Sequence, residues 1–98
     1  MVKQGDLLTT DGIAMPLLVI SKNTYNESGM MIVCPVVKKK PSNLLIEAID
    51  TPMLKGYVIC DSLRQLNWKE RGVFKKGSIS TAKLIRILDK VYAILDYV

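Results

Sequence analysis

The sequence contains no histidine among its 98 residues, which removes the commonest general acid and base of enzymes. A Ser-His-Asp triad and a Cys-His pair are therefore excluded. Two cysteines, Cys34 and Cys60, are too few for the four-ligand shell of a structural zinc ion. We expect neither a metal nor a cofactor, so any catalysis would depend on carboxylates, lysines, arginines, tyrosines or hydroxyls.

Long apolar segments are also missing. The longest uninterrupted apolar runs, such as residues 13–20, are too short to cross a bilayer. The N-terminal residues MVKQGD lack the apolar stretch of a signal peptide. Both cysteines lie in apolar runs, where cysteine behaves as a small hydrophobic residue, and a disulfide would be unusual in a reducing compartment. We expect a soluble, cytoplasmic protein with no membrane association.

Hydrophobic residues make up 49% of the chain, which is enough for a folded core and argues against disorder. The length suits one compact domain over residues 1–98. The net charge is +5, and the run Lys38-Lys39-Lys40 supplies three of these charges, leaving +2 for the rest of the chain. Such a local excess favours an anionic partner, although a run of three lysines is also typical of a solvated loop.

Short apolar runs separated by turn residues predict a largely β-structured first part. Asp11-Gly12 favours a tight hairpin turn, residues 23–29 form a polar loop, and Pro35 marks an edge strand or a bulge. Residues 61–66 are ambiguous but extended, and residues 67–72 form a turn. We expect strands at residues 6–10, 15–21, 30–37, 44–49, 57–60 and 73–76.

From Ser80 onward the apolar spacing becomes helical, and Ser80 is a suitable N-cap. Six aliphatic residues on one broad side predict a helix that packs on a sheet, or partly on a second subunit. The expected fold is mainly β (an α+β arrangement), a strongly bent antiparallel sheet or small barrel closed by this helix. The six residues are Leu84, Ile87, Leu88, Val91, Ile94 and Leu95.

The segment Gly56–Gly77 places five cations around Trp68, the only tryptophan. Lysine and arginine pair with phosphates, and an aromatic ring offers a stacking face, so this segment suits a polyanion such as single-stranded nucleic acid. The alternative is that Trp68 is a core or hinge residue, which is the commoner role of a lone tryptophan. The five cations are Arg64, Lys69, Arg71, Lys75 and Lys76.

The order of these segments resembles the MazF/PemK-type toxins, the mRNA interferases of toxin–antitoxin pairs. Three stretches carry the likeness: Gly5-Asp6, residues 16–29 with PLLVIS and Tyr25-Asn26, and Asp61–Gly77. The resemblance implies an SH3-like barrel, shared with the CcdB-type gyrase poisons, and a homodimer. It also implies metal-free cleavage of single-stranded RNA and inhibition by an acidic antitoxin segment.

The family's catalytic residues do not carry over to this sequence. An arginine precedes the proline of the second strand in the family, and Met15 stands at that position here. Counting from Pro35, Val37 replaces the family's threonine, which helps to hold the phosphate. The long loop between the first two strands is reduced to the Asp11-Gly12 hairpin, and Ser62 replaces a frequent glutamine. Loss of two donors at the reacting phosphate predicts weak or lost cleavage.

Three functions remain open from the sequence. The first is a non-catalytic toxin-family protein that binds RNA or an acidic antitoxin peptide in a basic groove. The second is an active endoribonuclease that uses relocated groups, with Lys38 as the cation and Thr9 or Thr10 as the hydroxyl. The third is a gyrase-poison-like inhibitor, although the end LDYV has no obvious match to that pattern. The candidate binding residues are Lys38, Lys39, Lys40, Arg64, Trp68, Lys69 and Arg71.

Overall fold

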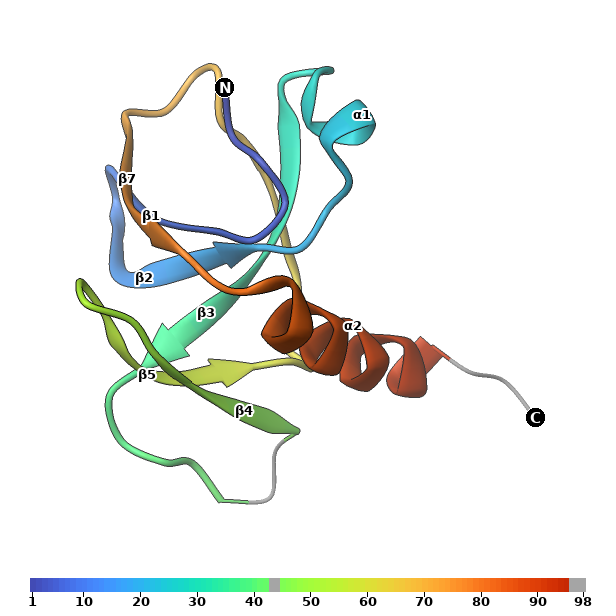
Figure 1. The fold of residues 1–98 in the computed structure, drawn as a ribbon. Helices are drawn as coiled ribbons and strands as arrows, with labels where there is room; N and C mark the ends of the chain where they lie inside the picture. The colour runs from blue at the N-terminus through green and yellow to red at the C-terminus, as the bar shows by residue number, and fades with distance from the viewer. Residues whose placement is uncertain (43–44, 96–98) are drawn as a thin grey trace.

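The computed structural model describes residues 1–42 and 45–95, and within them a curled sheet is covered by a C-terminal helix (Figure 1). The helices are α1 (Asn23–Asn26) and α2 (Thr81–Leu95). The strands of this described part are β1 (Asp6–Thr10), β2 (Ile13–Val19), β3 (Met30–Val37), β4 (Ile46–Asp50), β5 (Lys55–Ile59), β6 (Arg64–Asn67) and β7 (Val73–Ser78).

All strand pairs are antiparallel, in the order β4-β5-β3-β2-β1-β7, and β6 pairs with β3 beside this path. The long strand β3 has two partners on one side. Its first half, residues 30–33, pairs with β6, whereas Val36 and Val37 pair with β5. The sheet therefore bends around β3 into a half-barrel, which confirms the expected mainly β fold with its C-terminal helix.

Four of the expected strands, observed as β2, β4, β5 and β7, have other bounds in the structure. The second strand begins at Ile13, directly after the Asp11-Gly12 hairpin, and Gly12 has the positive φ of 84° that this turn was expected to need. The segment 61–66 is extended only from Arg64 onward. The expected strand 44–49 begins at a residue outside the described part, and the observed strand is β4.

Pro35 lies in a central strand, so the prediction of an edge or bulge is wrong. It is buried opposite Leu17 of β2. On the other side of β3, the ladder passes from Val33, which pairs with β6, to Val36, which pairs with β5. Pro35 thus sits between two ladders, where a residue without a backbone N–H is tolerated.

The predicted polar loop at residues 23–29 contains the single-turn helix α1. Buried Asn26 anchors it, because the Asn26 side-chain amide donates to the Ser21 carbonyl at 3.1 Å and the Ser21 hydroxyl donates to Asn26. The Ile32 N–H also donates to the Ser21 hydroxyl at 2.9 Å. A helix of four polar residues has no apolar periodicity, so sequence reasoning had no signal for it.

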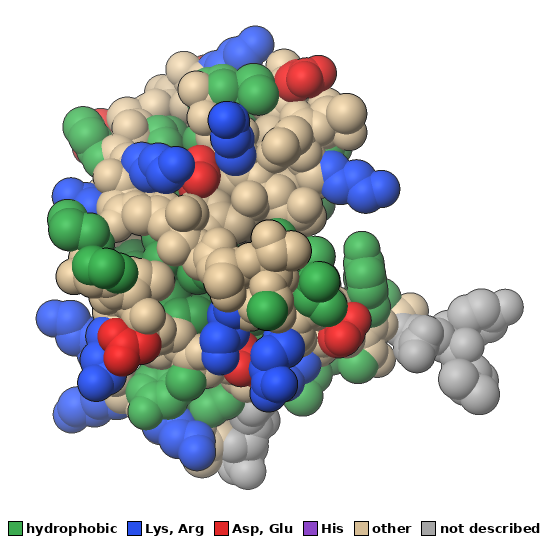
Figure 2. All heavy atoms as spheres, in the orientation of Figure 1, with side chains coloured by type: hydrophobic (Ala, Val, Ile, Leu, Met, Phe, Trp, Pro, Cys, Tyr) green, Lys and Arg blue, Asp and Glu red, His purple; other side chains and the backbone are tan. Residues whose placement is uncertain are grey.

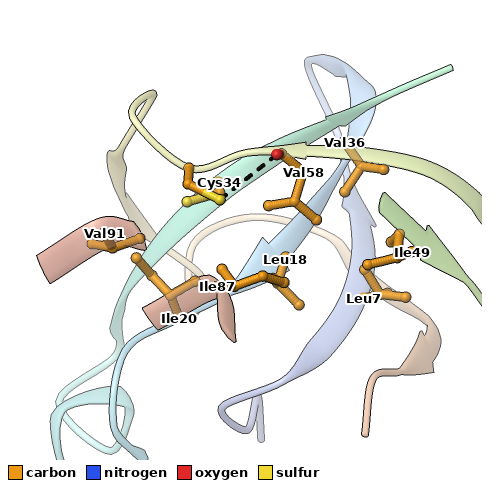
Figure 3. Close-up of a cluster of buried hydrophobic side chains, with 10 residues drawn as sticks. Leu7, Leu18, Ile20, Cys34, Val36, Ile49, Val58, Ile87 and Val91 are labelled. Atoms are coloured by element: carbon orange, nitrogen blue, oxygen red, sulfur yellow. Dashed lines mark hydrogen bonds between the residues drawn. The ribbon is translucent and has the colours of Figure 1, made fainter. Parts of the chain in front are cut away.

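The sheet separates two hydrophobic clusters. The first lies between the sheet and α2, and Figure 3 shows its side chains pointing toward one another from β1, β2, β3, β4, β5 and α2. The second lies on the other face and includes Leu8, Leu17, Met31 and Val33, with Trp68 packed against it. Alternation along β2 and β3 supplies both clusters, since neighbouring residues point to opposite faces.

The helix α2 buries only part of its predicted apolar face. Ile87 and Val91 are buried and Leu88 is half-buried, but Ile94 and Leu95 are 41% and 65% exposed. The Lys83 N–H donates to the Ser80 hydroxyl at 3.2 Å, which confirms the expected N-cap. Neither helix of the described residues has the length and apolar character needed to span a membrane.

Candidate nucleic-acid and partner interface

Trp68 begins the turn between β6 and β7 and holds that turn against α1. Its backbone N–H donates to the Gly29 carbonyl at 2.9 Å, and its indole Nε1 donates to the Asn26 carbonyl at 2.8 Å. The half-buried ring packs against the second hydrophobic cluster. Trp68 therefore has the structural role that the sequence left as an alternative, that of a core or hinge residue. Its hydrogen bond from Nε1 is the kind that a tryptophan usually makes when its ring is packed in a protein.

The same tryptophan also lines a cavity of about 400 Å³ with several of the predicted cations. The Lys69 ammonium lies 5.9 Å from the centre of the Trp68 ring, within the range of a cation–π contact. Lys75 reaches the buried Asp6 carboxylate at 3.2 Å, and the Lys3 backbone N–H donates to Asp6 at 2.9 Å. The cavity is lined by Met1, Val2, Asp6, Leu8, Trp68, Lys69, Arg71, Val73 and Lys75.

Arg71 joins this cavity to the hairpin between β1 and β2. Its guanidinium donates to the Asp11 carbonyl at 3.3 Å, and the Asp11 N–H donates to the Gly72 carbonyl at 3.1 Å. Arg64 is exposed on β6 opposite Val33 and does not line the cavity. The structure thus brings Trp68, Lys69 and Arg71 together, but it leaves Arg64 apart.

The lysine run lies at the other end of the molecule. In Figure 1 the segment after β3 is at the bottom, whereas the turn after β6 is at the top. Lys38 lines a different cavity, of about 660 Å³, which shares no residue with the cavity at Trp68. Lys39 and Lys40 are exposed beside it. The candidate binding residues therefore form two groups, with Arg64 apart from both, and no single groove holds them all.

The sequence resemblance places Met15 and Val37 at the family's catalytic positions, and both lie toward the same end of the paired strands β2 and β3. The pairing of β2 with β3 ends at Leu17 and Pro35, and Met15 and Val37 each lie two residues beyond this pair. Met15 is 41% exposed and Val37 is half-buried. Two apolar side chains stand here, and neither can donate a proton or carry charge to a phosphate.

The relocated catalytic groups considered from the sequence have other surroundings. The Thr10 hydroxyl donates to the Asp11 carbonyl at 3.1 Å, and Thr9 is half-buried on β1 opposite Phe74. Lys38 is exposed at the edge of its cavity. The described structure brings neither threonine into the cavity that Lys38 lines.

Sequence reasoning missed a cluster of charges between β4 and α2. Glu47 is only 6% exposed and accepts hydrogen bonds from Lys83 at 2.9 Å, Arg86 at 3.2 Å and Lys90 at 2.6 Å. Burial alone would raise the pKa of Glu47, but these three cations hold it at about 2. The spacing of the cations along the helix was a visible signal, but nothing in the sequence identified the strand carboxylate they meet.

Both cysteines lie in the core, as the sequence predicts. Both thiols are buried and free, and burial raises the pKa of Cys34 to about 12 and that of Cys60 to about 11. Both therefore stay protonated near neutral pH and act as core residues. Across residues 1–42 and 45–95, no group of three or more potential ligands could hold a metal ion.

Comparison with known proteins gives one consistent family. The family model for the PemK-like, MazF-like toxin of type II toxin–antitoxin systems matches residues 9–95. A search of curated proteins by sequence gave no match. Several solved structures share the fold over nearly the whole chain.

One similar structure is a MazE–MazF complex from Deinococcus radiodurans, which is 24% identical to this chain with a TM-score of 0.87. The alignment covers 96% of this chain and 95% of that one. Another is an endoribonuclease in complex with its cognate antitoxin from a mycobacterial species, which is 21% identical with a TM-score of 0.83. This second alignment covers 97% of this chain and 95% of the mycobacterial one. At sequence identities of 21% and 24%, the likeness shows a shared fold.

Proposed function

This chain belongs to the PemK-like, MazF-like toxin family of type II toxin–antitoxin systems, and from that premise we propose that it binds RNA or an acidic antitoxin segment while its ribonuclease activity is weak or lost. Two similar structures contain an antitoxin partner, which supports an antitoxin partner here. The two basic cavities, at Trp68 and at Lys38, offer cations to a polyanion of either kind.

The observation that carries the loss of cleavage is the pair Met15 and Val37 at one end of β2 and β3. Metal-free cleavage of RNA needs a base for the 2′-hydroxyl, an acid for the leaving oxygen and stabilisation of the phosphate charge. A thioether and an isopropyl group provide none of these. Removing even one such donor commonly lowers the rate by about 10²–10³-fold.

The protein acts as a homodimer in this proposal, in the cytoplasm where it would meet RNA and antitoxin. An apolar groove of about 310 Å³ runs between α1 and the second half of α2, lined in part by Leu63, Leu88, Tyr92 and Leu95. Tyr92 is 59% exposed, next to the exposed end of the apolar helix face. A second copy would cover this surface, because an exposed apolar patch on a water-soluble domain usually marks a protein contact.

Incubation of the purified protein with a pool of single-stranded RNA tests the proposal directly. We expect no fragments with cyclic-phosphate ends at protein concentrations where an active interferase digests the pool. Extensive cleavage would instead establish the relocated-residue enzyme, and substitution of Lys38, Thr9 and Thr10 would then identify its groups. Growth arrest with intact RNA and broken DNA would favour a gyrase-poison-like inhibitor, whose expected contact residues 96–98 lie outside the described part.

A further inference from the structure

The end of the molecule formed by β4, β5 and α2 carries a large excess of positive charge. Residues 38–60 and 81–95 together carry seven cations and three carboxylates, a difference of +4, out of +5 for the whole chain. Figure 2 shows Lys and Arg side chains over the lower part of the molecule, with Asp and Glu side chains among them. Residues 61–77, around Trp68, carry five cations and two carboxylates, a difference of +3.

Three lysines from three different elements meet at the cavity of about 660 Å³ in this region. Lys38 follows β3, Lys55 begins β5 and Lys83 lies in the first turn of α2. Asp50 also lines the cavity, but in the described part of the chain neither Lys38 nor Lys55 forms an ion pair. Tyr57 and the backbone at Gly56 complete the wall, and the volume is typical of a site for a small ligand.

Glu47 holds three of the cationic side chains of this surface in fixed positions. The buried carboxylate fixes Lys83 at 2.9 Å on the cavity wall and also holds Arg86 and Lys90. One carboxylate neutralises one of these three cations and leaves an excess of two charges. Cationic side chains that are already ordered lose less conformational entropy when an anion binds.

We propose that this cavity is a phosphate-binding site, in which Lys38, Lys55 and Lys83 contact the oxygens of one phosphate group. That group can belong to a free phosphate compound or to the backbone of a single-stranded RNA. Binding of an RNA phosphate at this cavity rests on the proposed function, whereas binding of a free phosphate compound does not. Phosphate suits the site because it accepts from several ammonium groups at once, and lysine binds it as a point charge.

Binding of two probes tests this site, with the unaltered protein and the double variant Lys38→Gln/Lys55→Gln. Pyrophosphate titration is followed by the NMR shifts of the Gly56 and Ala48 amides, which line the cavity. A single-stranded RNA 12-mer is followed by fluorescence anisotropy over a range of salt concentrations. The matched control is Lys3→Gln/Lys22→Gln, which removes the same charge from exposed positions outside both basic cavities.

We expect the Lys38/Lys55 variant to lose the pyrophosphate shifts, and its plot of log affinity against log salt for RNA to become less steep by about 1.4. The control should keep the pyrophosphate shifts. If the Lys38/Lys55 variant loses the pyrophosphate shifts but binds RNA as before, the ligand of the cavity is a free phosphate compound. If it keeps the pyrophosphate shifts but its RNA binding becomes less dependent on salt, the ligand is the RNA backbone. If both variants behave alike with both probes, or if only an acidic peptide moves these amides, the inference is wrong.

These experiments can refute the phosphate site and the proposed function independently of each other. RNA binding that is unchanged in the Lys38/Lys55 variant, together with unchanged pyrophosphate shifts, refutes the cavity and leaves the proposed function intact. An unaltered protein that binds no RNA counts against the RNA part of the proposed function. The pyrophosphate titration still decides whether the cavity binds phosphate in that case.

Discussion

Glu47 of β4 and Lys90 of α2 lie 43 residues apart in the sequence, yet the Lys90 ammonium donates to the Glu47 carboxylate at 2.6 Å. The same ammonium donates to the Ile46 carbonyl at 2.7 Å. Apolar packing through Ile87 and Val91 holds α2 on the sheet but tolerates small rotations of the helix. The directional bonds to Glu47 fix which side of α2 faces β4.

Removal of the Glu47 charge should destabilise the fold in a pH-dependent way. The folded-state pKa of about 2 lies below the ordinary value of 4.5, so ionised Glu47 stabilises the fold above pH 4.5. That contribution disappears as the pH falls toward 2. We expect Glu47→Gln to lower the free energy of unfolding by about 2–3 kcal/mol at pH 7 and by much less near pH 2.

Urea unfolding at several pH values measures this difference. The control is Glu70→Gln, which removes an exposed carboxylate that forms no ion pair within residues 1–42 and 45–95. A Glu47→Gln effect that stays the same from pH 7 to pH 2 would show that the carboxylate contributes through packing and not through its charge.

Restoration of the family's two donors should restore cleavage. We expect Met15→Arg/Val37→Thr to raise the rate of RNA cleavage about 10²-fold or more, because the new groups can stabilise charge on the reacting phosphate. Gel analysis of a labelled single-stranded RNA pool measures the rate. Met15→Gln/Val37→Thr is the control, since it adds polarity without the cation. Equal rates for the two variants would contradict a role for the missing cation.

Disruption of the apolar groove should separate the proposed dimer. Tyr92→Asp places a charge in the surface between α1 and α2, and we expect the dimer dissociation constant to rise about 30-fold or more. Light scattering coupled to size-exclusion chromatography measures the mass across a dilution series. Ile85→Asp is the control, because Ile85 is 52% exposed on α2 but lies outside the groove. An unaltered dimer in Tyr92→Asp would place the interface elsewhere.

Trp68→Phe should weaken the fold even though the ring stays aromatic. The substitution removes the indole donor to the Asn26 carbonyl and part of the packing on the second cluster. We expect the free energy of unfolding to fall by about 1–2 kcal/mol. Chemical denaturation followed by circular dichroism measures it, with Phe74→Leu at an exposed site of β7 as the control. Unchanged stability would leave ligand stacking as the sole role of Trp68.

Local patterns in the sequence were sufficient for most strands, the Asp11-Gly12 hairpin and the N-cap at Ser80, because each depends on neighbouring residues. They were not sufficient for Pro35, whose place in the centre of the sheet depends on which strands pair with β3. The Glu47 cluster joins residues 36 to 43 positions apart, so no local rule reveals it.

The candidate binding residues also include some that are neighbours in the sequence and some that only the fold brings together. The neighbours Trp68, Lys69 and Arg71 line one cavity, since one turn carries all three. The lysine run seemed to belong with them only because both are basic. In the structure Lys38 instead lines a cavity with Lys55 and Lys83, which come from distant elements that the fold alone brings together.

The pairing of β1 with β7 has a consequence for how the chain folds as the ribosome makes it. β1 emerges well before β7, so Asp6–Thr10 cannot complete this side of the sheet until Val73–Ser78 has also appeared. Until then one edge of β1 presents unpaired backbone groups, which invite contact with other chains. Such distant contacts also slow folding, so most of the domain has to be synthesised before its half-barrel is complete.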